Sequence, residues 1–474
     1  MNSLKPMLLT SLKSYDRTQF VKDVTAGIIV AIIALPLSIA LALASGVGPE
    51  AGIFTAIVAG FVISALGGSS VQIAGPTAAF ATIVAGIVAK DGLDGLVIST
   101  ILAGIFLILM GLCHFGSLIK FIPYTITTGF TSGIAVTIVI GQLKDFFGVT
   151  YPDGVKPIET TEKFKAFIEN ISTMNTAALI VGIVSLAILI ISPVIFKKIP
   201  GSLIAVIVGI LMVKFLPLKV STIGNLYTIS NSLPAFHLPA VNLHIIENAL
   251  PNAFTIAILA AIESLLSCVV ADGMINGKHR SDMELVAQGA GNIASALFGG
   301  IPATGAIART AANIKNGGHT PVAGMVHSIT LVIVLVVLMP YAGMIPMPTI
   351  AAILFIVAYN MCQWRTFLQL VKTAPKSDIL VLVVTFVLTV LFDLVVAIEI
   401  GMILACLLFI KRMSEETKAE SWVYTDDDTV AVNENLRKLP AEIRVYEVSG
   451  PLFFGASDAI EHIVVEESAK CLVL

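Results

Sequence analysis

The chain has 474 residues, of which 57% are hydrophobic and only 12% are charged, and its formal net charge is −3. Soluble domains carry roughly 25% charged residues, so this composition excludes an ordinary soluble domain and indicates an all-α polytopic membrane protein. A net charge this small gives no reason to expect a nucleic-acid partner. Residues 1–22 contain scattered basic side chains and no short apolar core with a cleavage site, which predicts a cytoplasmic N-terminal segment rather than a signal peptide.

Apolar runs of about the length that crosses a bilayer recur along the chain and form two sets of seven. The first set defines a repeat at residues 23–217 and the second a repeat at residues 250–412, with an extracellular linker at residues 218–249. The expected spans lie at residues 24–43, 50–66, 76–90, 95–113, 123–142, 174–195 and 201–217 in the first repeat, and at residues 251–271, 283–298, 304–315, 321–343, 348–361, 378–391 and 394–411 in the second.

An odd number of spans in each repeat places the two repeats in opposite orientations, which is an inverted repeat. With the N-terminus inside, the expected inner loops hold basic residues such as Lys197, Lys198, Lys278 and Arg280. This positive-inside bias predicts a multi-pass protein of the plasma or inner membrane with both termini in the cytoplasm.

The composition becomes that of a soluble protein after Arg412. We expect a linker at residues 413–439 and part of an α/β domain at residues 440–474. The alternation in EIRVYEV and the apolar run CLVL predict strands around a helix. Because so short a segment cannot bury a core of its own, we expect the chain to stop inside this domain.

Two matching breaks interrupt the hydrophobic pattern, one in each repeat. The helix end ISALGG leads into GGSSVQIAGPTAAFATI at residues 67–83, and ASALFGG leads into GGIPATGAIART at residues 299–310. Glycines and a proline in each break precede a short helix of small residues. Interrupted helices at matching places in two repeats point to the binding site of a transporter.

The N-termini of these short helices predict a site for an anion, because they present free N–H groups and a partial positive charge. An arginine in the second short helix adds a guanidinium. Helix packing, which also favours small residues, is the alternative explanation of each break. The expected ligand-facing residues are Thr77, Ala78 and Ala79 on the first helix and Ala306, Ile307, Ala308 and Arg309 on the second.

Glu263 lies in the middle of an expected span, with Ser264 beside it and Ser267 one turn away on the same face. An ionised carboxylate inside a bilayer is costly, so Glu263 must face a polar cavity, take up a proton or pair with a cation. If it shares a pocket with an anion held by Arg309, it must be protonated or screened, which couples the anion to a proton. The alternatives are a structural carboxylate capped by hydroxyls and backbone amides, and a permanent ion pair with Arg309.

Pro36 is expected to kink the first span, either exposing carbonyl groups beside Leu37 and Ser38 or acting as a kink alone. The sequence has no metal-ligand spacing and no phosphate-binding loop, so we expect neither a metal site nor another cofactor, and no use of ATP.

These motifs resemble the sulfate permease (SulP) family of anion transporters along nearly the whole chain. The tail EIRVYEVSGPLFFGAS is similar to the opening of the cytoplasmic STAS domain that follows the membrane domain in that family. The segments that carry the resemblance are ALPLSIALALASGVGPEAGIFTAIVAGF, GGSSVQIAGPT, LIKFIPYTITTGFTSGIAV, AIESLLSCVVADGM and GGIPATGAIARTAANIKNGGHTPVAG.

The resemblance implies fourteen spans divided into a core domain, spans 1–4 and 8–11, and a gate domain, spans 5–7 and 12–14. It further implies a substrate held between half-helices 3 and 10, an elevator-like motion of the core against the gate, and a homodimer. Carried over by position, the site comprises Leu37 and Ser38 on span 1, Thr77 and its two neighbours on span 3, Glu263 and Ser267 on span 8, and Ala306–Arg309 on span 10.

Glutamate at Glu263 together with Arg309 resembles the proton-coupled members that carry sulfate or dicarboxylates, whereas sodium-coupled bicarbonate relatives have an aspartate and lack the arginine. The sequence therefore predicts a proton-coupled symporter of sulfate or a small carboxylate. The alternatives are a sodium-coupled bicarbonate symporter, an uncoupled exchanger and a nucleobase-type carrier. A membrane enzyme and a signalling protein with the tail as its output are the rival classes.

Overall fold

A computed structural model of the chain describes residues 4–117, 123–152, 154–155, 157–195, 200–216, 218–239, 243–392, 394–415, 418–422, 443–449 and 471–473. Helices account for most of the regular structure in these ranges. The α-helices are α1 (Leu8–Ser11), α2 (Arg17–Ala44), α3 (Pro49–Leu66), α4 (Ala78–Leu112), α5 (Tyr124–Phe147), α6 (Thr160–Glu169), α7 (Thr176–Ile195), α8 (Gly201–Phe215), α9 (Ile223–Leu226), α10 (Leu243–Ile275), α11 (Ser281–Leu297), α12 (Ile307–Lys315), α13 (Pro321–Ala342), α14 (Met347–Cys362), α15 (Trp364–Thr373), α16 (Lys376–Leu391) and α17 (Leu394–Glu415). The 3-10 helices are η1 (Leu12–Ser14) and η3 (Ile171–Thr173), and the strands are β1 (Ala74–Gly75), β2 (Thr304–Gly305), β3 (Lys418–Trp422), β4 (Ile443–Ser449) and β5 (Cys471–Val473).

Local signals in the sequence determine where several helices begin. The side chain of Asp16 caps α2 by accepting a hydrogen bond from the N–H of Gln19 at 2.8 Å. Thr320 caps α13 in the same way, accepting from the N–H of Val322. Pro49 is the first residue of α3, where its missing N–H would have had no helical partner.

Each of the fourteen expected spans falls on a helix, and α4 holds two of them. By length and composition alone, eight helices of the described part of the chain are long and apolar enough to cross a membrane. Helices such as α8, α12 and α16 are shorter, which a membrane tolerates where the helix is packed against protein. The helix α10 begins at Leu243, earlier than the expected start at Pro251, because the helix continues through this proline.

The helix α4 changes direction at Gly92, which has a φ of 71° and separates the third span from the fourth. In the second repeat the corresponding helices α12 and α13 are separate, and Gly317, with a φ of 92°, lies between them. A glycine with positive φ thus separates the third span from the fourth in the first repeat and the tenth from the eleventh in the second. This correspondence agrees with the predicted repeat architecture.

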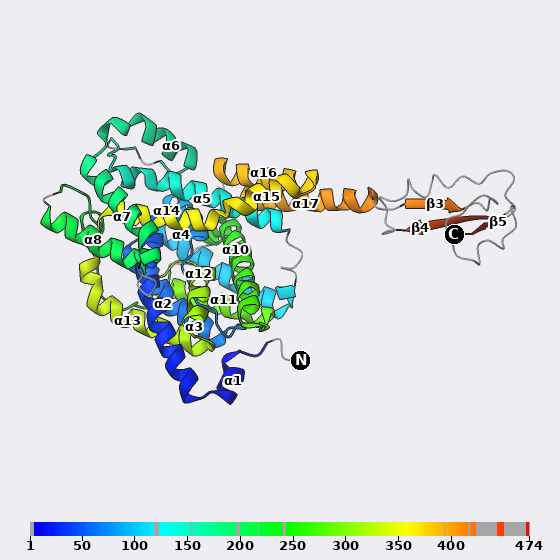
Figure 1. Cartoon of the computed structure of the whole chain (residues 1–474), viewed down its shortest axis with the longest axis horizontal. Coiled ribbons are helices and arrows are strands. Elements are labelled where there is room, and N and C mark those ends of the chain that lie inside the picture. Colours follow the sequence, from blue (N-terminus) through cyan, green and yellow to red (C-terminus); the bar gives the residue numbers. More distant parts are fainter. Residues whose placement is uncertain are drawn as a thin grey trace.

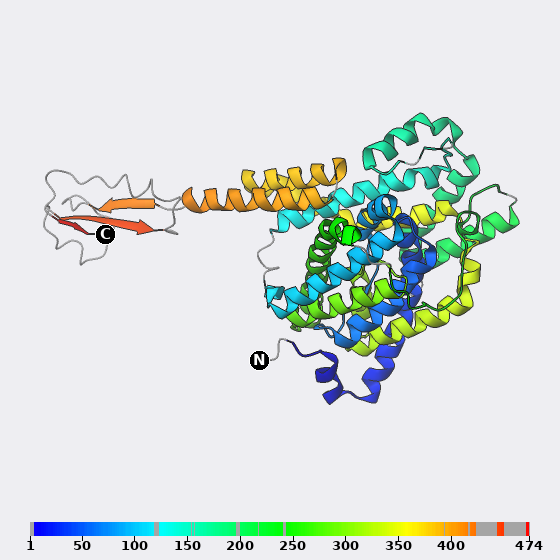
Figure 2. The same cartoon turned by 180° about the vertical axis from the view of Figure 1, so that it is seen from behind.

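The helices pack mainly within two groups. In the first group α4 packs against α10 and α11, while α13 packs against α2 and α3. In the second group α5 packs against α14 and α16, α7 against α8 and α14, and α17 against α16. Figures 1 and 2 show α5 and α14–α17 along the upper side of the helical body, with α3, α11, α12 and α13 below them. These groups correspond to the predicted core and gate domains.

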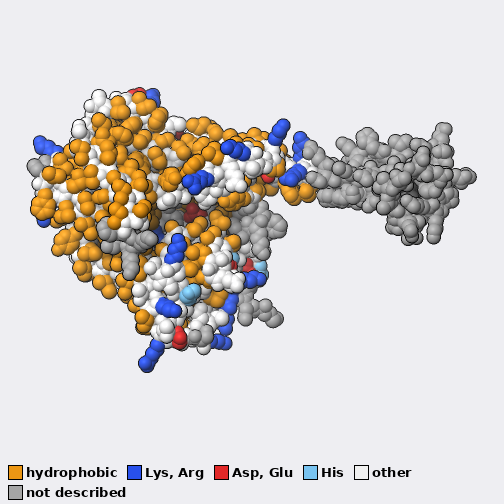
Figure 3. Space-filling view, in the orientation of Figure 1, with side chains coloured by type: hydrophobic (Ala, Val, Ile, Leu, Met, Phe, Trp, Pro, Cys, Tyr) orange, Lys and Arg blue, Asp and Glu red, His pale blue; other side chains and the backbone are white. Residues whose placement is uncertain are grey.

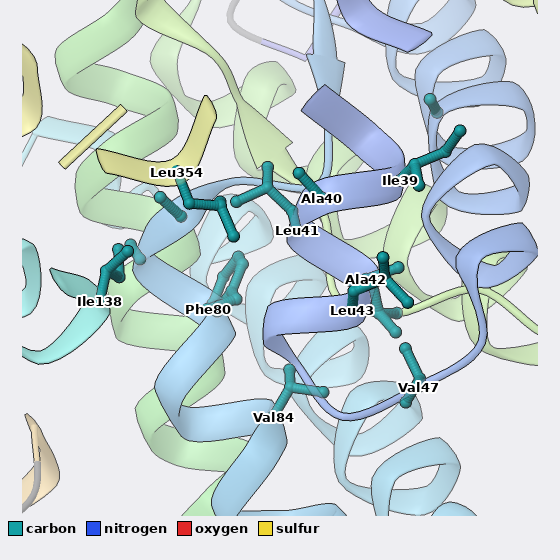
Figure 4. Close-up of a cluster of buried hydrophobic side chains, with 14 of the residues drawn as sticks. Ile39, Ala40, Leu41, Ala42, Leu43, Val47, Phe80, Val84, Ile138 and Leu354 are labelled. Atoms are coloured by element: carbon teal, nitrogen blue, oxygen red, sulfur yellow. The ribbon is translucent and has the colours of Figure 1, made fainter. Parts of the chain in front are cut away.

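Apolar side chains fill the boundary between the two groups. Leu41 of α2 and Phe80 of α4 belong to the same buried cluster as Ile138 of α5 and Leu354 of α14. Figure 4 shows Phe80, in the first turn of α4, pointing towards Leu41 and Leu354. The start of α4 is therefore held between the two groups by hydrophobic contacts.

Large hydrophobic side chains also cover much of the outer surface, as Figure 3 shows. Examples are Ile183 of α7, Ile329 of α13 and Ile403 of α17, which are 52%, 53% and 61% exposed. Soluble monomers rarely expose apolar patches of this extent, so these faces contact lipid.

Three strands follow α17 and form a sheet in the order β3-β4-β5. Strands β3 and β4 are antiparallel and pair Lys418 with Ser449, whereas β4 and β5 are parallel and pair Ile443 with Cys471. The strands predicted in EIRVYEV and CLVL are thus confirmed, and β3 lies in the segment expected to be a linker. The helix expected between β4 and β5 lies outside the described residues.

The contact between α4 and α11 depends on two facing glycines. A Cβ at Gly289 would lie 2.4 Å from the carbonyl oxygen of Gly104. We therefore expect Gly289→Val to force the helices apart and to lower the stability of the protein by roughly 1–3 kcal/mol, measured as a lower thermal unfolding midpoint in detergent. Gly86→Ala is the matched control on α4, because an added Cβ there meets no heavy atom within 4 Å. Equal midpoints for Gly289→Val and the wild type would contradict this packing.

Candidate anion site

The two breaks in the helices meet as a short antiparallel pair of strands. Strand β1 pairs with β2 so that Ala74 is opposite Gly305 and Gly75 is opposite Thr304. The N–H of Ala306 extends the pairing by donating to the carbonyl oxygen of Ile73 at 2.9 Å. The half-helices α4 and α12 begin directly after these strands, so their N-termini lie on either side of the crossing.

Polar side chains hold the two breaks in this position. The Thr310 hydroxyl of α12 accepts a hydrogen bond from the N–H of Ile73 at 3.0 Å. The side-chain amide of Asn313 donates to the carbonyl of Val71 at 2.9 Å. Each bond joins the second repeat to the segment that leads into the first half-helix, and each satisfies a backbone group that the broken helix leaves without a helical partner.

The first half-helix begins with Thr77, which is the N-cap residue of α4 and has an extended backbone conformation. Its hydroxyl donates a hydrogen bond to Oε2 of Glu263 at 2.9 Å. Ala78 and Ala79 form the first turn and are buried, at 6% and 0% exposed. This end of α4 therefore contacts α10 through Thr77, while the two alanines that follow are packed inside the structure.

The second half-helix begins with Ala306 as its N-cap residue. Ala306 is half-buried, whereas Ile307 and Ala308 are exposed. The first turn of α12 therefore has two exposed residues, Ile307 and Ala308, followed by the buried Arg309.

Arg309 is almost completely buried, with 2% of its surface exposed. It reaches across the crossing, and its Nη2 donates to the carbonyl oxygen of Pro76 at 2.7 Å. A Cβ on Gly75 would lie 2.4 Å from its Nη1, so the guanidinium packs directly over this glycine. Its Nε and Nη1 have no hydrogen-bond partner among the described residues. Buried donors without partners are rare in proteins, and each calls for an explanation such as a bound ion or a water molecule.

Glu263 of α10 is half-buried and is bonded to Thr77. The ion pairs found among the described residues include His114 with Asp282, Lys165 with Glu169 and His279 with Asp272, but not Glu263 with Arg309. Glu263 and Arg309 thus form no ion pair. The sequence left open a permanent ion pair between Glu263 and Arg309. These two described residues do not form it, so each side chain remains available to another partner.

The remaining predicted site residues lie in the same group of helices. Ser38 of α2 is fully buried, and its hydroxyl has no hydrogen-bond partner in the described part of the chain. Ser267 of α10, one turn from Glu263, is 1% exposed and is likewise unpartnered. Leu37 is partly buried and packs against the main hydrophobic cluster.

Sequence reasoning missed the polar residues that surround this site. Glu284 and Gln288 of α11 are completely buried, as is Asn292 one turn further on. Gln72, just before β1, bonds to both Ser264 and Glu284. The signal in the sequence was weak, because Glu284 is the second residue of the expected span and lies in the first turn of α11, where acidic residues are common. The partners of Glu284 were not predictable, because they lie in other helices and in the break.

The comparisons with known proteins agree with this architecture. Residues 20–385 match the model of the sulfate permease family. The putative sulfate transporter YvdB of Bacillus subtilis is 40% identical over 464 residues, which cover 97% of this chain and 85% of that protein. The bicarbonate transporter BicA of Synechocystis sp. is 33% identical, with 94% of this chain and 81% of that protein covered.

Solved structures show the same fold. The transmembrane domain of a cyanobacterial bicarbonate transporter BicA matches with a TM-score of 0.73 and 30% identity, covering 81% of this chain and 98% of that chain. Murine Solute Carrier 26 family member A9 in its inward-facing state matches in fold with a TM-score of 0.85 and 20% identity, over 99% of this chain and 82% of that chain. Together with the paired broken helices, these matches show that the chain is a multi-pass membrane protein of the sulfate permease family.

Proposed function

We propose that this chain is a secondary active transporter that carries sulfate or a small carboxylate by symport with protons. The observation that carries the proposal is Arg309, a buried guanidinium with two unpartnered nitrogens at the meeting point of two helix N-termini. The planar fork of a guanidinium matches the paired oxygens of an oxyanion, and the helix N-termini add further N–H donors. Relatives named as sulfate and bicarbonate transporters support the same chemical class.

The position of Glu263 supports coupling to protons. Its carboxyl group bonds to Thr77, the residue at which the first half-helix begins, and Arg309 does not neutralise it. An ionised Glu263 repels an anion bound at Arg309, and a protonated one does not. Anion and proton therefore bind most favourably together, which is the thermodynamic requirement for symport.

A sodium-coupled bicarbonate symporter is the second candidate. It is favoured by the matches to BicA in sequence and in structure. In this alternative a sodium ion, rather than a proton, neutralises Glu263, and the hydroxyl oxygen of Thr77 supplies a second oxygen ligand.

Transport requires that the site be open to one side of the membrane at a time. The proposed motion slides the first group of helices, with the site, along the apolar boundary that contains Phe80 and Leu354. Spin labels on Ile329 of α13 and Ile183 of α7, both lipid-facing, are expected to report this motion as a change of several ångströms in their separation between inward-facing and outward-facing conditions. Identical distance distributions in both conditions would rule out an elevator.

The family resemblance also leads us to propose a homodimer in the plasma or inner membrane with both termini cytoplasmic. Cross-linking in native membranes and protease protection of the N-terminal segment test these two features. If cross-linking yields only monomers, the proposed homodimer is refuted. If the N-terminus is protected from protease in inside-out vesicles, its cytoplasmic location is refuted.

Uptake into proteoliposomes tests the coupling ion. Sulfate, bicarbonate and fumarate are offered with an inward proton gradient or an inward sodium gradient. We expect proton-driven accumulation in the wild type. Glu263→Gln resembles the protonated carboxyl group, so this variant is expected to lose the response to the gradient while retaining exchange of internal for external anion.

The comparison between the two proteins separates the candidates. Accumulation driven by sodium alone would replace proton symport by the second candidate. Equal, gradient-independent uptake by the wild type and Glu263→Gln would make Glu263 structural and the protein a facilitator or exchanger. Uptake of none of the three anions would refute the proposed substrate class.

The contribution of Arg309 is tested by binding rather than by transport. Arg309→Gln removes the charge and the forked donors, and hydrogen bonds to charged groups contribute about 1.5–3 kcal/mol each. We expect at least a tenfold loss of anion affinity for each such bond that is removed. The measurement is the rise in thermal unfolding midpoint with anion concentration.

Arg280→Gln provides the matched control for Arg309→Gln. Arg280 also makes hydrogen bonds through its guanidinium, but to the carbonyl groups of Lys5 and Pro6 and to the hydroxyl of Thr10, at the N-terminal segment. This control is expected to lower the midpoint without changing the anion dependence. Equal anion affinities in the wild type and Arg309→Gln would place the anion elsewhere.

A further inference from the structure

Helix α11 carries a stripe of buried polar residues beside the candidate site. Glu284, Gln288 and Asn292 are each 0% exposed, and their spacing of four residues places them on one face. Asn292 bonds to both the N–H and the carbonyl of Ala303, at 2.8 and 2.9 Å, in the segment that leads into β2. Gln288 donates to Glu284 at 2.9 Å. The stripe is therefore bonded to the segment that forms the second half of the crossing.

Glu284 bonds to the segment that leads into the first half of the crossing. Its Oε2 accepts hydrogen bonds from the N–H groups of Gly68 and Ser69, at 2.9 and 3.2 Å. Its Oε1 accepts from the side-chain amide of Gln72 at 2.7 Å and from the hydroxyl of Ser264 at 3.2 Å, besides Gln288. Five donors thus converge on one carboxyl group.

This arrangement suits an ionised Glu284, because charge-assisted hydrogen bonds to a carboxylate are the stronger ones. Four of the five partners present N–H groups to the carboxyl group, and the fifth is the hydroxyl of Ser264. No ion pair of Glu284 with a lysine, arginine or histidine is recorded among the described residues. Among the described residues, Glu284 is therefore a buried carboxyl group that is stabilised by hydrogen-bond donors and not by a cationic side chain.

The contacts of Glu284 reach each part of the candidate site. Residues 68–72 lead directly into β1 and then to Thr77, which bonds to Glu263. Ser264 follows Glu263 on α10. The amide of Gln72 lies against β2, since a Cβ at Gly305 would be 2.3 Å from its Nε2. The carboxyl group of Glu284 thereby bonds to the first break and to the turn of α10 that contains Glu263. It also bonds to the side chain of Gln72, which packs on β2.

The fold alone does not require a charge at this place. Helix α3 occupies the matching position in the first repeat, and alignment of ISAL with ASAL sets Ile53 opposite Glu284 and Ile57 opposite Gln288. Thr55 of α3 bonds to the break of the second repeat through a neutral hydroxyl group. This hydroxyl accepts a hydrogen bond from the N–H of Ile301 at 2.7 Å. The second break is thus held by neutral side chains, including Asn292, whereas the first is held by the carboxyl group of Glu284.

We propose that Glu284 is a positioning residue of the anion site, an ionised carboxylate that holds Thr77 and Glu263 in the register at which the anion and the coupling ion bind together. This inference rests on the proposed transport function. It assigns to α11 a role in substrate affinity, although Glu284 itself touches neither ligand.

The test compares Glu284→Gln and Glu284→Asp with Asp23→Asn. Asp23 is the matched control, because it is also 0% exposed and also accepts five hydrogen bonds, from Tyr15, Gln19, His319 and twice from Thr320. It ties α2 to the start of α13 and contacts neither break. Initial rates of uptake of sulfate, bicarbonate and fumarate are measured against anion concentration, and each rate is normalised to the folded protein recovered from the proteoliposomes.

Glu284→Gln turns an amide donor towards other donors and is expected to raise KM for the transported anion at least about tenfold, the equivalent of one lost hydrogen bond to a charged group. Glu284→Asp keeps the charge with a shorter reach and is expected to raise KM less. Asp23→Asn is expected to lower the yield of folded protein and to keep the wild-type KM. A purely structural role predicts that both buried carboxylates behave alike, with less folded protein and an unchanged KM.

The outcomes separate this inference from the proposed function. Wild-type uptake together with a wild-type KM in Glu284→Gln overturns the role of Glu284 and leaves the transport function intact. If Glu284→Gln yields no folded protein, Glu284→Asp decides: a raised KM supports the role and a wild-type KM overturns it. A wild type that takes up none of the three anions overturns the proposed function and this inference with it.

Discussion

The antiparallel contact between β1 and β2 is the interaction on which the rest of this structure depends. A helix that breaks inside a membrane leaves backbone N–H and carbonyl groups without partners, and no water is available to satisfy them. Pairing Ala74 with Gly305 and Gly75 with Thr304 lets each break satisfy the other. Because the two breaks come from repeats of opposite orientation, the same contact also brings two helix N-termini together, which creates a region suited to an anion.

The three ionisable side chains around this contact differ in how many hydrogen-bond partners they have. Among the described residues, Arg309 is buried with unpartnered donors, Glu263 accepts one hydrogen bond, from the hydroxyl of Thr77, and Glu284 accepts five. A protein that needed these charges only for stability would pair the arginine with a carboxylate, since unpaired buried charges are costly. In the proposed function, their separation leaves Arg309 and Glu263 available for ligands, whereas Glu284 holds the surrounding structure. This difference is the physical basis for assigning binding to the first two and positioning to the third.

The division of the helices into two groups determines how such a site can be used. Polar bonds hold the breaks to α10, α11 and α12, all within the first group. Phe80, Leu41 and Leu354 meet at the boundary with the second group in a hydrophobic cluster. Apolar contacts are non-directional, so the sliding proposed above would cost less than if hydrogen bonds joined the two groups. A site that lies within one group suits the proposed transporter, which would expose that site to each side of the membrane in turn.

The sequence by itself determined the number of spans, the places where two of them break, and the residue types that make an anion site plausible, because hydrophobic length, glycines and prolines act locally. Helix α10 passes through Pro251, although a proline usually marks a boundary, because packing in a membrane protein stabilises a helix that contains one. Only the tertiary structure decided which polar groups meet. The hydrogen-bond partner of Glu263 is Thr77 and not Arg309. The sequence pattern did not single out Glu284. Such partners are distant in the chain, and their contacts follow from how α10 and α11 pack around the crossing, which no local pattern encodes.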